Sequence, residues 1–347
     1  MTVKMEDIAR LAGVSKSAVS LALSGKPGIG AETREKIVRI AKEHGYPIKA
    51  RSAAAAKSGA LTLLVFANSG IVLEQYYDQP FFRELIPFIE ERCRARGFSL
   101  LFSSLDGDAP VEGLAASIEG TGSDGVILLG TNLSKSQVAD IAGRLGCPLV
   151  VLDTCFDTLP VHFIEINNRM GAYQAGVHLC ELGHTRIGYI QSNVRIHNFA
   201  ERQRGFAEAL QERGLAVADK HTLSVAPTIL SSQEELKQQL QSLIAAGEPL
   251  PTAFFCECDY IAISAMKTLS ELGWRIPEDI SVIGFDNISE SRIVSPELTT
   301  VHVAKKQIAY HAVDLLMQEL EAEDQDKVKI KVDTHFVERS STAPPKL

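Results

Sequence analysis

The sequence predicts an all-α helix-turn-helix headpiece followed by an α/β core of two doubly wound parallel-sheet subdomains. Three short amphipathic patterns near the amino end predict the headpiece. Two series of short apolar runs, alternating with helical patterns, predict the core. With 347 residues, of which 45% are hydrophobic and 22% charged, the chain has a globular composition and enough length for more than one hydrophobic core.

The three amphipathic patterns lie between Met5 and Gly45, and each is too short to form a stable helix alone, so they must pack together. The turn from Ala12 to Ser15 joins the first two, and Ser15 is placed to cap the second. Two helices joined this tightly are typical of a helix-turn-helix, whose second helix enters the DNA major groove. An ordinary helical hairpin at a domain edge is the alternative. The residues expected to face the shared core are Met5, Ile8, Ala9, Ala12, Val19, Ala22, Leu23, Ile37, Ile40 and Ala41.

The charge differs in sign between the two parts of the chain. Residues 1–60 carry 11 Lys and Arg against 5 Asp and Glu, a net charge of +6, whereas the remainder carries 24 against 38, a net charge of −14. A basic head on an acidic body indicates that the head meets a polyanion. A solvated basic face would give the same count, so the charge supports the motif without establishing it.

Residues 47–59, "PIKARSAAAAKSG", predict a hinge or linker helix. The segment has high helix propensity but no apolar stripe to bury, so we expect it to become ordered on a partner. The predicted domains are therefore a headpiece over 1–46, this linker, and a core over 60–347.

Seven apolar runs in the core predict buried parallel strands whose carboxyl ends form ligand sites. They are "LTLLVF" (61–66), "FSLLFS" (98–103), "GVILLG" (125–130), "PLVVLD" (148–153), "RIGYIQ" (186–191), "TAFFCE" (252–257) and "SVIGFD" (281–286). Amphipathic segments such as "FFRELIPFIEERCRARG" lie between them.

Several classes of protein are disfavoured by the sequence. The absence of an apolar run of about 18 residues argues against a membrane span, and the acidic residues in "MTVKMEDIAR" argue against a signal peptide, so we expect a cytoplasmic protein. Six scattered cysteines are expected as reduced core thiols, and "CEC" at 256–258 has no second pair at zinc spacing, so no metal is expected. Without a P-loop, a dinucleotide-binding motif or a nucleophile elbow, we expect neither an enzyme nor a cofactor.

The string "MEDIARLAGVSKSAVSLALSGKPGIGAETREKIVRIAKEHGY" resembles the headpiece of the LacI family of bacterial transcription regulators. The stretches "GHTRIGYI", "IPEDISVIGFDNI" and "SPELTTVHV" extend the resemblance over almost the whole chain. It implies a periplasmic-binding-protein-like core in which the chain crosses between subdomains three times. We place the crossings near 160, 289 and 323, which gives an N-subdomain of 60–160 plus 290–322 and a C-subdomain of 161–289 plus 323–342.

The resemblance also implies the DNA-contacting residues. Lys16 and Ser17 match positions that read base edges, and hydroxyl groups suit phosphate contacts. Leu21 stands where an Arg usually contacts DNA, and Ala54 stands where a Leu often enters the minor groove, so we expect an altered operator sequence and a weaker kink. The full set is Lys4, Ser15, Lys16, Ser17, Ser20, Leu21, Ser24, Thr33, Tyr46 and Ala54.

Three residues match effector-binding positions of the family. Asp153 and Asp286 each end a predicted strand, and Arg202 lies three residues before a Gly, as does an Arg that commonly contacts the ligand. Two carboxylates and an Arg suit a hydroxyl-rich ligand, because charged groups make the stronger hydrogen bonds. Taken alone, the two Asp residues could equally cap turns or helices, and Arg202 could lie on a helix surface.

Other expected effector contacts depart from the family. Cys258 and Asp259 stand where Asn-Asp is usual, and a thiol is a weak hydrogen-bonding group, so the pocket is expected to be less polar there. Phe66 occupies a position that can be polar in sugar-responsive members. A sugar is the default effector, and a less polar or larger ligand is the alternative.

The segment 67–82, "ANSGIVLEQYYDQPFF", is longer than the loop usually found between the first strand and the first helix of the core. Tyr76, Tyr77 and Phe81 could line or cover the cleft and stack on a ring. An ordinary surface loop with aromatic residues against the subdomain is equally consistent with the sequence.

The resemblance implies a dimeric repressor that binds a pseudo-palindromic operator under control of a small-molecule effector, by default a carbohydrate. The carboxyl end "VERSSTAPPKL" has no Leu heptads, so we expect a homodimer and no coiled-coil tetramer. A solute-binding protein without a DNA role is the alternative from another class, and the basic head argues against it.

Overall fold

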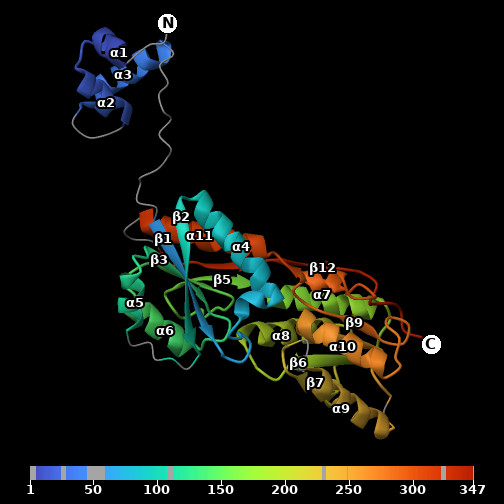
Figure 1. The fold of residues 1–347 in the computed structure, drawn as a ribbon. Helices are drawn as coiled ribbons and strands as arrows, with labels where there is room; N and C mark the ends of the chain where they lie inside the picture. The colour runs from blue at the N-terminus through green and yellow to red at the C-terminus, as the bar shows by residue number, and fades with distance from the viewer. Residues whose placement is uncertain are drawn as a thin grey trace. The chain divides into compact units, whose positions relative to one another are not determined.

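The computed structural model describes residues 5–24, 29–44, 59–107, 109, 113–228, 232–247, 249–321 and 326–346 (Figure 1). The chain divides into two compact units, Met1–Ser58 and Gly59–Leu347. The first contains only helices among its described residues, and the second is an α/β core.

The first unit confirms the three predicted helices. They are α1 (Met5–Ala12), α2 (Lys16–Ser24) and α3 (Ala31–Glu43), and each contacts the other two. Their shared core is formed by the buried side chains of Ile8, Ala9, Ala12, Val19, Ala22, Ile37 and Ala41. Met5, Leu23 and Ile40, also expected in the core, are partly buried against it.

The turn between α1 and α2 has the local chemistry that a tight helix connection requires. Gly13 adopts a φ of +70°, and the N–H of Val14 donates to the carbonyl of Ala9 at 3.0 Å, which ends α1. The N–H of Ala18 donates to Oγ of Ser15 at 3.1 Å. The predicted N-cap is therefore confirmed, and the two helices are joined as in a helix-turn-helix.

The first sheet of the second unit is a six-stranded parallel sheet in the order β11-β5-β4-β3-β1-β2. The strand order reverses between β1 and β3, and loops at such a switch point form the ligand crevice of doubly wound sheets. The strands are β1 (Gly59–Ala67), β2 (Phe98–Asp106), β3 (Gly125–Leu129), β4 (Leu149–Leu152), β5 (His162–Ile166) and β11 (Lys329–Val332).

Helices cover both faces of this sheet, and alternate strand residues explain which helix lies on which face. Leu64 and Phe66 of β1 join the core beneath α5 (Leu114–Gly120) and α6 (Lys135–Arg144). Leu63 and Val65 of the same strand join the core beneath α4 (Pro80–Ala95) and α11 (Lys305–Glu321). The period of two along a strand produces these two layers.

The second sheet is parallel with the order β7-β6-β8-β9, and its switch point lies between β6 and β8. A separate antiparallel pair, β10-β12, lies beside β9 through isolated bridges. Helices α7 and α8 share one apolar cluster with the sheet, and α9 and α10 share another. The bounds are β6 (Ile187–Ser192), β7 (Thr222–Val225), β8 (Ala253–Cys256), β9 (Ser281–Ile283), β10 (Thr300–Val303), β12 (Thr334–Val337), α7 (Asn168–Glu181), α8 (His197–Gln211), α9 (Ser232–Ala245) and α10 (Asp259–Glu271). Three short 3-10 turns are η1 (Tyr76–Asp78), η2 (Asp219–His221) and η3 (Ser289–Arg292).

The seven predicted strands are confirmed as β1, β2, β3, β4, β6, β8 and β9, but the predicted assignment of segments to subdomains is wrong in three places. Strands β5 and β11 belong to the first sheet, and β10 lies with the second. The chain therefore crosses after β5, after β10 and after β11, rather than near 160, 289 and 323. The physical reason is that β11 is a charged edge strand, in which Lys331 pairs with Glu165 of β5 at 3.2 Å, so neither strand reads as an apolar run.

Candidate functional site

A cavity lies between the carboxyl ends of the two sheets, where both switch points face each other. From the first subdomain it is lined by Ile71, Gln79, Phe81, Phe82, Thr131 and Asp153. From the second it is lined by Ile196, Asn198, Phe199, Arg202, Cys258 and Asp286, with Pro227 and Tyr260 at its margin. The lining is mostly apolar and aromatic, with a few converging polar groups, as is usual for small-molecule sites.

Five of the eight expected effector residues line this cavity: Phe81, Asp153, Arg202, Cys258 and Asp286. The other three do not. Phe66 is buried in the core between the first sheet and α5, because its place in β1 directs it to the face opposite α4. Tyr77 is 52% exposed and stacks edge to face on Tyr76, which is itself buried in the core.

Asp153 and Asp286 have an unusual backbone conformation. Their φ values are +65° and +115°, whereas residues other than glycine rarely have positive φ. Such conformations cost about 1 to 3 kcal/mol each and persist where a site requires them. Each Asp follows a strand end, so the turn aims the carboxylate into the cavity instead of along the sheet.

The Asp153 carboxylate joins the two subdomains by hydrogen bonds. The hydroxyl of Thr131 donates to Oδ2 at 2.6 Å, and Nδ2 of Asn198 donates to Oδ1 at 2.7 Å. Thr131 follows β3 in the first sheet, whereas Asn198 lies in α8 of the second subdomain. Burial raises the pKa of Asp153, and both donors oppose that rise by favouring the carboxylate.

Arg202 continues the network in the second subdomain. Its Nη2 pairs with Oδ1 of Asp286 at 3.0 Å, its Nε donates to Oδ1 of Asn168 at 2.8 Å, and its Nη1 donates to the carbonyl of Glu257. The guanidinium also lies over the ring of Phe285, 3.8 Å from its centroid. Arg202 is therefore a buried, fully positioned charge and not a helix-surface residue.

A glycine in α8 places Arg202 this deeply. A Cβ atom at Gly205 would lie 2.0 Å from the carbonyl oxygen of Arg169 in α7, so only glycine allows the two helices to approach so closely. The Arg lies one helical turn before this contact. The spacing of Arg202 and Gly205 thus has a packing reason: the glycine brings the helix near enough for the Arg to reach Asp286.

Burial shifts the pKa values of two residues in the cavity walls. Burial raises the pKa of Asp286 to about 6, although Arg202 and Lys305 lower it. Burial also raises the pKa of the Cys258 thiol, so Cys258 is a neutral and weakly polar wall residue. The only permanent cation among the lining residues is Arg202, and it is already paired with Asp286.

The side chain of Asp259 does not reach the cavity. Oδ1 accepts the hydroxyl of Thr300 at 2.6 Å, and Oδ2 accepts the N–H of Ile288 at 3.0 Å. Asp259 therefore fastens the start of α10 to the segment that follows Asp286. It supports the site, and it is not among the residues that line the cavity.

The position of Asp259 predicts a pH dependence of stability. Burial and then the nearby Asp286 raise its pKa to about 8. A carboxyl whose folded-state pKa is raised binds its proton more tightly in the folded chain, so the free energy of unfolding should fall as the pH rises from about 5 to about 8. The slope is at most about 1.4 kcal/mol per pH unit for one group. Urea unfolding at several pH values measures it.

The matched variants are Asp259→Asn and Asp279→Asn. The first should flatten the slope. The second should leave it unchanged, because Asp279 lies at the surface beside Arg275 and Lys346, and these lower its pKa below the range tested. Because the raised pKa of Asp286, about 6, gives a slope of its own below about pH 6, the comparison is made between pH 6 and 8. A slope in that range that is as steep in Asp259→Asn as in the wild type would contradict the assignment.

The long loop after β1 covers one side of the cavity. Nε2 of Gln79 donates to the carbonyl of Ile71 at 2.9 Å, and its Oε1 accepts the N–H of Leu73 at 3.0 Å, which holds the loop closed on itself. A Cβ atom on Gly70 would lie 3.1 Å from Val194 of the opposite subdomain, so the loop meets its counterpart there. Ile71 and Gln79 line the cavity but carry no motif, and sequence reasoning missed both.

Sequence reasoning also missed Glu257, which is 0% exposed. Both of its carboxylate oxygens lie within 2.8 Å of Nη1 of Arg195, and they accept the N–H of Ser192 at 2.7 Å and the hydroxyl of Tyr189 at 2.9 Å. Glu257 thus anchors the loop that leads into α8. Its signal in the sequence is an acidic residue directly after the apolar run of β8.

The expected DNA-contacting residues of α2 lie mostly on its exposed side. Ser15, Lys16, Ser17 and Ser20 are exposed, whereas Val19 and Ala22 of the same helix are buried. Nζ of Lys16 pairs with Glu6 at 2.7 Å at the surface. Leu21 and, in α3, Thr33 are half-buried. Lys4, Tyr46, Ala54, the side chain of Ser24 and most of the predicted linker lie outside the described residues.

Two further sequence expectations concern metals and membranes. Among the residues that the structure describes, no cluster of three or more His, Cys, Asp or Glu side chains is arranged to hold a metal ion. All six cysteines are free thiols. Within the described ranges, no helix has the length and apolar character needed to span a bilayer.

Comparisons with known proteins agree with both units. Residues 4–47 match the family model described as bacterial regulatory proteins, lacI family, and residues 177–342 match a periplasmic binding protein-like domain. The ribose operon repressor of Haemophilus influenzae is 33% identical over 322 residues, which cover 91% of each chain. The HTH-type transcriptional repressor PurR of Pasteurella multocida is 29% identical over 340 residues, covering 97% of this chain and 98% of PurR.

Solved structures share the fold over nearly the whole chain. A complex of the transcriptional regulator CelR with cellobiose has a TM-score of 0.70 at 24% identity and covers 98% of this chain and 99% of its own. The lac repressor dimer bound to operator and the anti-inducer ONPF has a TM-score of 0.70 at 23% identity and covers 99% and 100%. At these identities the likeness shows the architecture alone.

Proposed function

Because this chain belongs to the LacI family of bacterial regulatory proteins, we propose that it is a transcriptional repressor whose affinity for a specific operator is controlled by a small molecule in the cavity. The family consists of DNA-binding regulators and not of enzymes. The observation that carries the proposal is the combination, in one chain, of a helix-turn-helix unit and a cavity with two buried carboxylates and an Arg.

The proposed DNA surface is the exposed side of α2 with the basic charge around it. Ser15, Lys16 and Ser17 stand at the amino end of this helix, where a recognition helix meets base edges. Lys can donate to guanine acceptors, and the hydroxyls of Ser20, Ser24 and Thr33 suit phosphate oxygens. Lys4, Tyr46 and Ala54 complete the proposed contacts, and Leu21 changes the sequence that is read.

The proposed effector is a small carbohydrate. One relative is named as a ribose operon repressor, and one protein of the same fold was solved in complex with cellobiose. The cavity offers carboxylate, amide and hydroxyl groups that can bind sugar hydroxyls. Phe81, Phe82 and Phe199 supply apolar walls for the faces of a ring. Phe66, Tyr77 and Asp259 stay outside this proposed contact set, and Asn198 and Thr131 join it.

The proposed assembly is a homodimer in the cytoplasm. A twofold dimer presents two headpieces to the two half-sites of a pseudo-palindromic operator. The effector acts by binding one arrangement of the two core subdomains more tightly than the other, since only a difference in affinity can shift the equilibrium. A solute-binding protein without a DNA role would need no helix-turn-helix unit, which disfavours that alternative.

The test is selection of bound genomic fragments from the source organism by the full-length protein at near-physiological salt, without and with D-ribose or cellobiose. We expect a few palindromic sites to be enriched. Lys16→Ala should weaken binding to them by about tenfold or more, because one good base contact contributes about 1 to 3 kcal/mol. Lys36→Ala, on the exposed part of α3, is the matched control and should change binding only a few-fold.

Two results would contradict the proposal. Absence of any enriched site with or without a sugar would remove the repressor function. Equal binding to all fragments with a steep salt dependence would identify a DNA-binding protein without sequence specificity.

A further inference from the structure

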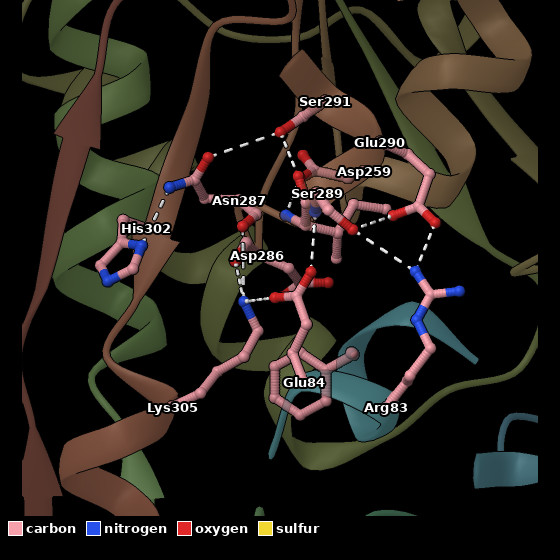
Figure 2. A network of polar contacts seen from close by, with 12 residues as sticks. Arg83, Glu84, Asp259, Asp286, Asn287, Ser289, Glu290, Ser291, His302 and Lys305 are labelled. Carbon is pink, nitrogen blue, oxygen red and sulfur yellow. Dashed lines mark hydrogen bonds and ion pairs between the residues drawn. The ribbon is translucent and has the colours of Figure 1, made fainter. Parts of the chain in front are cut away.

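The segment from Asp286 to Glu290 is held from the opposite subdomain. It follows β9 in the second subdomain and begins with the cavity residue Asp286. Figure 2 shows Glu84 and Arg83 of α4, together with Lys305 of α11, converging on this segment. Helices α4 and α11 contact each other and the strands of the first sheet, so all three side chains belong to the first subdomain.

Lys305 binds the backbone that shapes the Asp286 turn. Its Nζ donates to the carbonyl of Asp286 at 2.8 Å and lies 3.4 Å from the carbonyl of Asn287 (Figure 2). Both of these residues have positive φ, +115° and +50°. A conformation of this cost needs an external partner to persist, and the ammonium group supplies it.

The Lys305 ammonium is buried and needs a counter-charge. Lys305 is 4% exposed, and Oε2 of Glu84 lies 3.0 Å from its Nζ. The ammonium also lies 5.5 Å from the ring centroid of Phe81, which lines the cavity. The carboxylate, the backbone carbonyl and the aromatic ring together offset the cost of burying this cation. Without the carboxylate, the buried charge would be uncompensated.

Glu84 contacts both subdomains at once. While Oε2 pairs with Lys305, Oε1 accepts the N–H of Ser289 at 2.7 Å. The neighbouring pair of Arg83 with Glu290, at 2.6 Å, is partly solvent-exposed and contributes less by itself. The contacts of Lys305 and Glu84 with this segment therefore join the two subdomains, and the Glu84–Lys305 pair within the first subdomain keeps both side chains in place.

We propose that Lys305 is a positioning residue for the effector contact of Asp286, and that Glu84 holds Lys305 in place. The inference rests on the proposed function of the cavity as the effector site. The hydrogen bonds of Lys305 and Glu84 would couple a ligand bound at Asp286 to α4 and α11 of the other subdomain. A purely structural staple would stabilise the fold without changing how tightly the cavity binds its ligand.

The experiment compares Lys305→Met and Glu84→Gln with the wild type in the full chain. Lys306→Met is the control for the first, since Lys306 is an exposed neighbour whose ammonium lies over the rings of Phe88 and Tyr310 and not beside the segment 286–290. Glu90→Gln is the control for the second, because Glu90 pairs with Arg94 at the surface. Calorimetric titration with D-ribose and with cellobiose measures ligand affinity.

For the sugar that binds the wild type, we expect Lys305→Met to lower the affinity by about tenfold, because the substitution leaves buried polar groups without their partner. Glu84→Gln should weaken it less, because the glutamine oxygen can still accept from Ser289. Lys305→Arg should recover part of the affinity, and both controls should stay within about twofold. Equal affinity in Lys305→Met and the wild type would overturn the proposal, even if the melting temperature falls.

If the wild type binds neither sugar, the proposed effector class is overturned. The positioning role of Lys305 is then tested by a measurement that needs no ligand. Hydrogen–deuterium exchange of the segment 286–290 then decides. Faster exchange there in Lys305→Met and Glu84→Gln, with no change in Lys306→Met and Glu90→Gln, supports the role. Unchanged exchange in all four variants overturns it.

Discussion

Replacing Arg202 with alanine is expected to abolish effector binding and to lower the free energy of unfolding of the core by about 3 to 5 kcal/mol. The variant leaves the buried Asp286 carboxylate without its guanidinium and leaves Asn168 and the carbonyl of Glu257 without a donor. Urea unfolding and titration with the effector measure the two losses.

The control is Arg204→Ala, two residues along the same helix. Arg204 is 70% exposed in its side chain and pairs only at the surface with Glu201, so its removal should cost less than about 1 kcal/mol and leave effector affinity unchanged. Adding Asp286→Asn to Arg202→Ala should restore part of the stability, because the uncompensated charge is then gone. Equal losses in Arg202→Ala and Arg204→Ala would show that the buried pair is not what holds the site.

The second large effect is a difference in stability loss between variants of two paired residues, Arg195→Ala and Glu257→Gln. Arg195→Ala should lower the free energy of unfolding by about 2 kcal/mol, because it strands a carboxylate that is 0% exposed. Glu257→Gln should cost about 1 kcal/mol or less, since the amide oxygen still accepts from Ser192, the amide NH2 can donate to the hydroxyl oxygen of Tyr189, and Arg195 can turn to water.

Urea unfolding of the two variants checks this asymmetry, with Arg169→Ala as the control. Arg169 forms an exposed pair with Glu208 on the adjoining helices and should contribute little. If Glu257→Gln destabilises the core more than Arg195→Ala, the burial of the carboxylate is not the dominant cost.

The strands buried on both faces were the most direct to predict, because that burial makes the sequence a continuous apolar run, whereas the edge strand β2 was predicted although only partly buried. Strands β1, β3 and β4 are of this kind, and their bounds fall within a residue or two of the predicted ones. Strand β11, "KIKV", is an edge strand with charged residues alternating outward, so it carries no such run. The crossings misplaced near 160 and 323 follow from that omission together with the charged residue inside β5, whereas the one misplaced near 289 concerns β10, which pairs with β12 beside the second sheet.

The site could be predicted where the backbone forced the side chain into the cavity. Asp153 and Asp286 sit at strand ends, and Arg202 sits a turn before the glycine that brings α8 close to α7. Phe66 and Asp259 are adjacent in sequence to site elements but point the other way. The alternation of side chains along a strand and the position at a helix start decide where these two side chains point. A match to a family motif does not give that direction.

Gln79, Asn198 and Thr131 could not be found from the sequence. Each reaches the cavity because of a contact with a residue far away in the chain or with its own loop. Polar residues of these types occur throughout loops and helix starts, so nothing in the local pattern separates them from solvent-exposed neighbours.

The hydrogen bond from Asn198 to Asp153 has a consequence for the sensitivity of the regulator. Thr131 and Asn198 each occupy one lone pair of the carboxylate, so a ligand hydroxyl that reaches Asp153 meets an acceptor whose negative charge is already shared with two donors. The ligand therefore gains less from this contact than it would from an unpartnered carboxylate. At the proposed effector site, the ligand concentration that half-fills the cavity is higher than it would be if Asp153 had no protein donors.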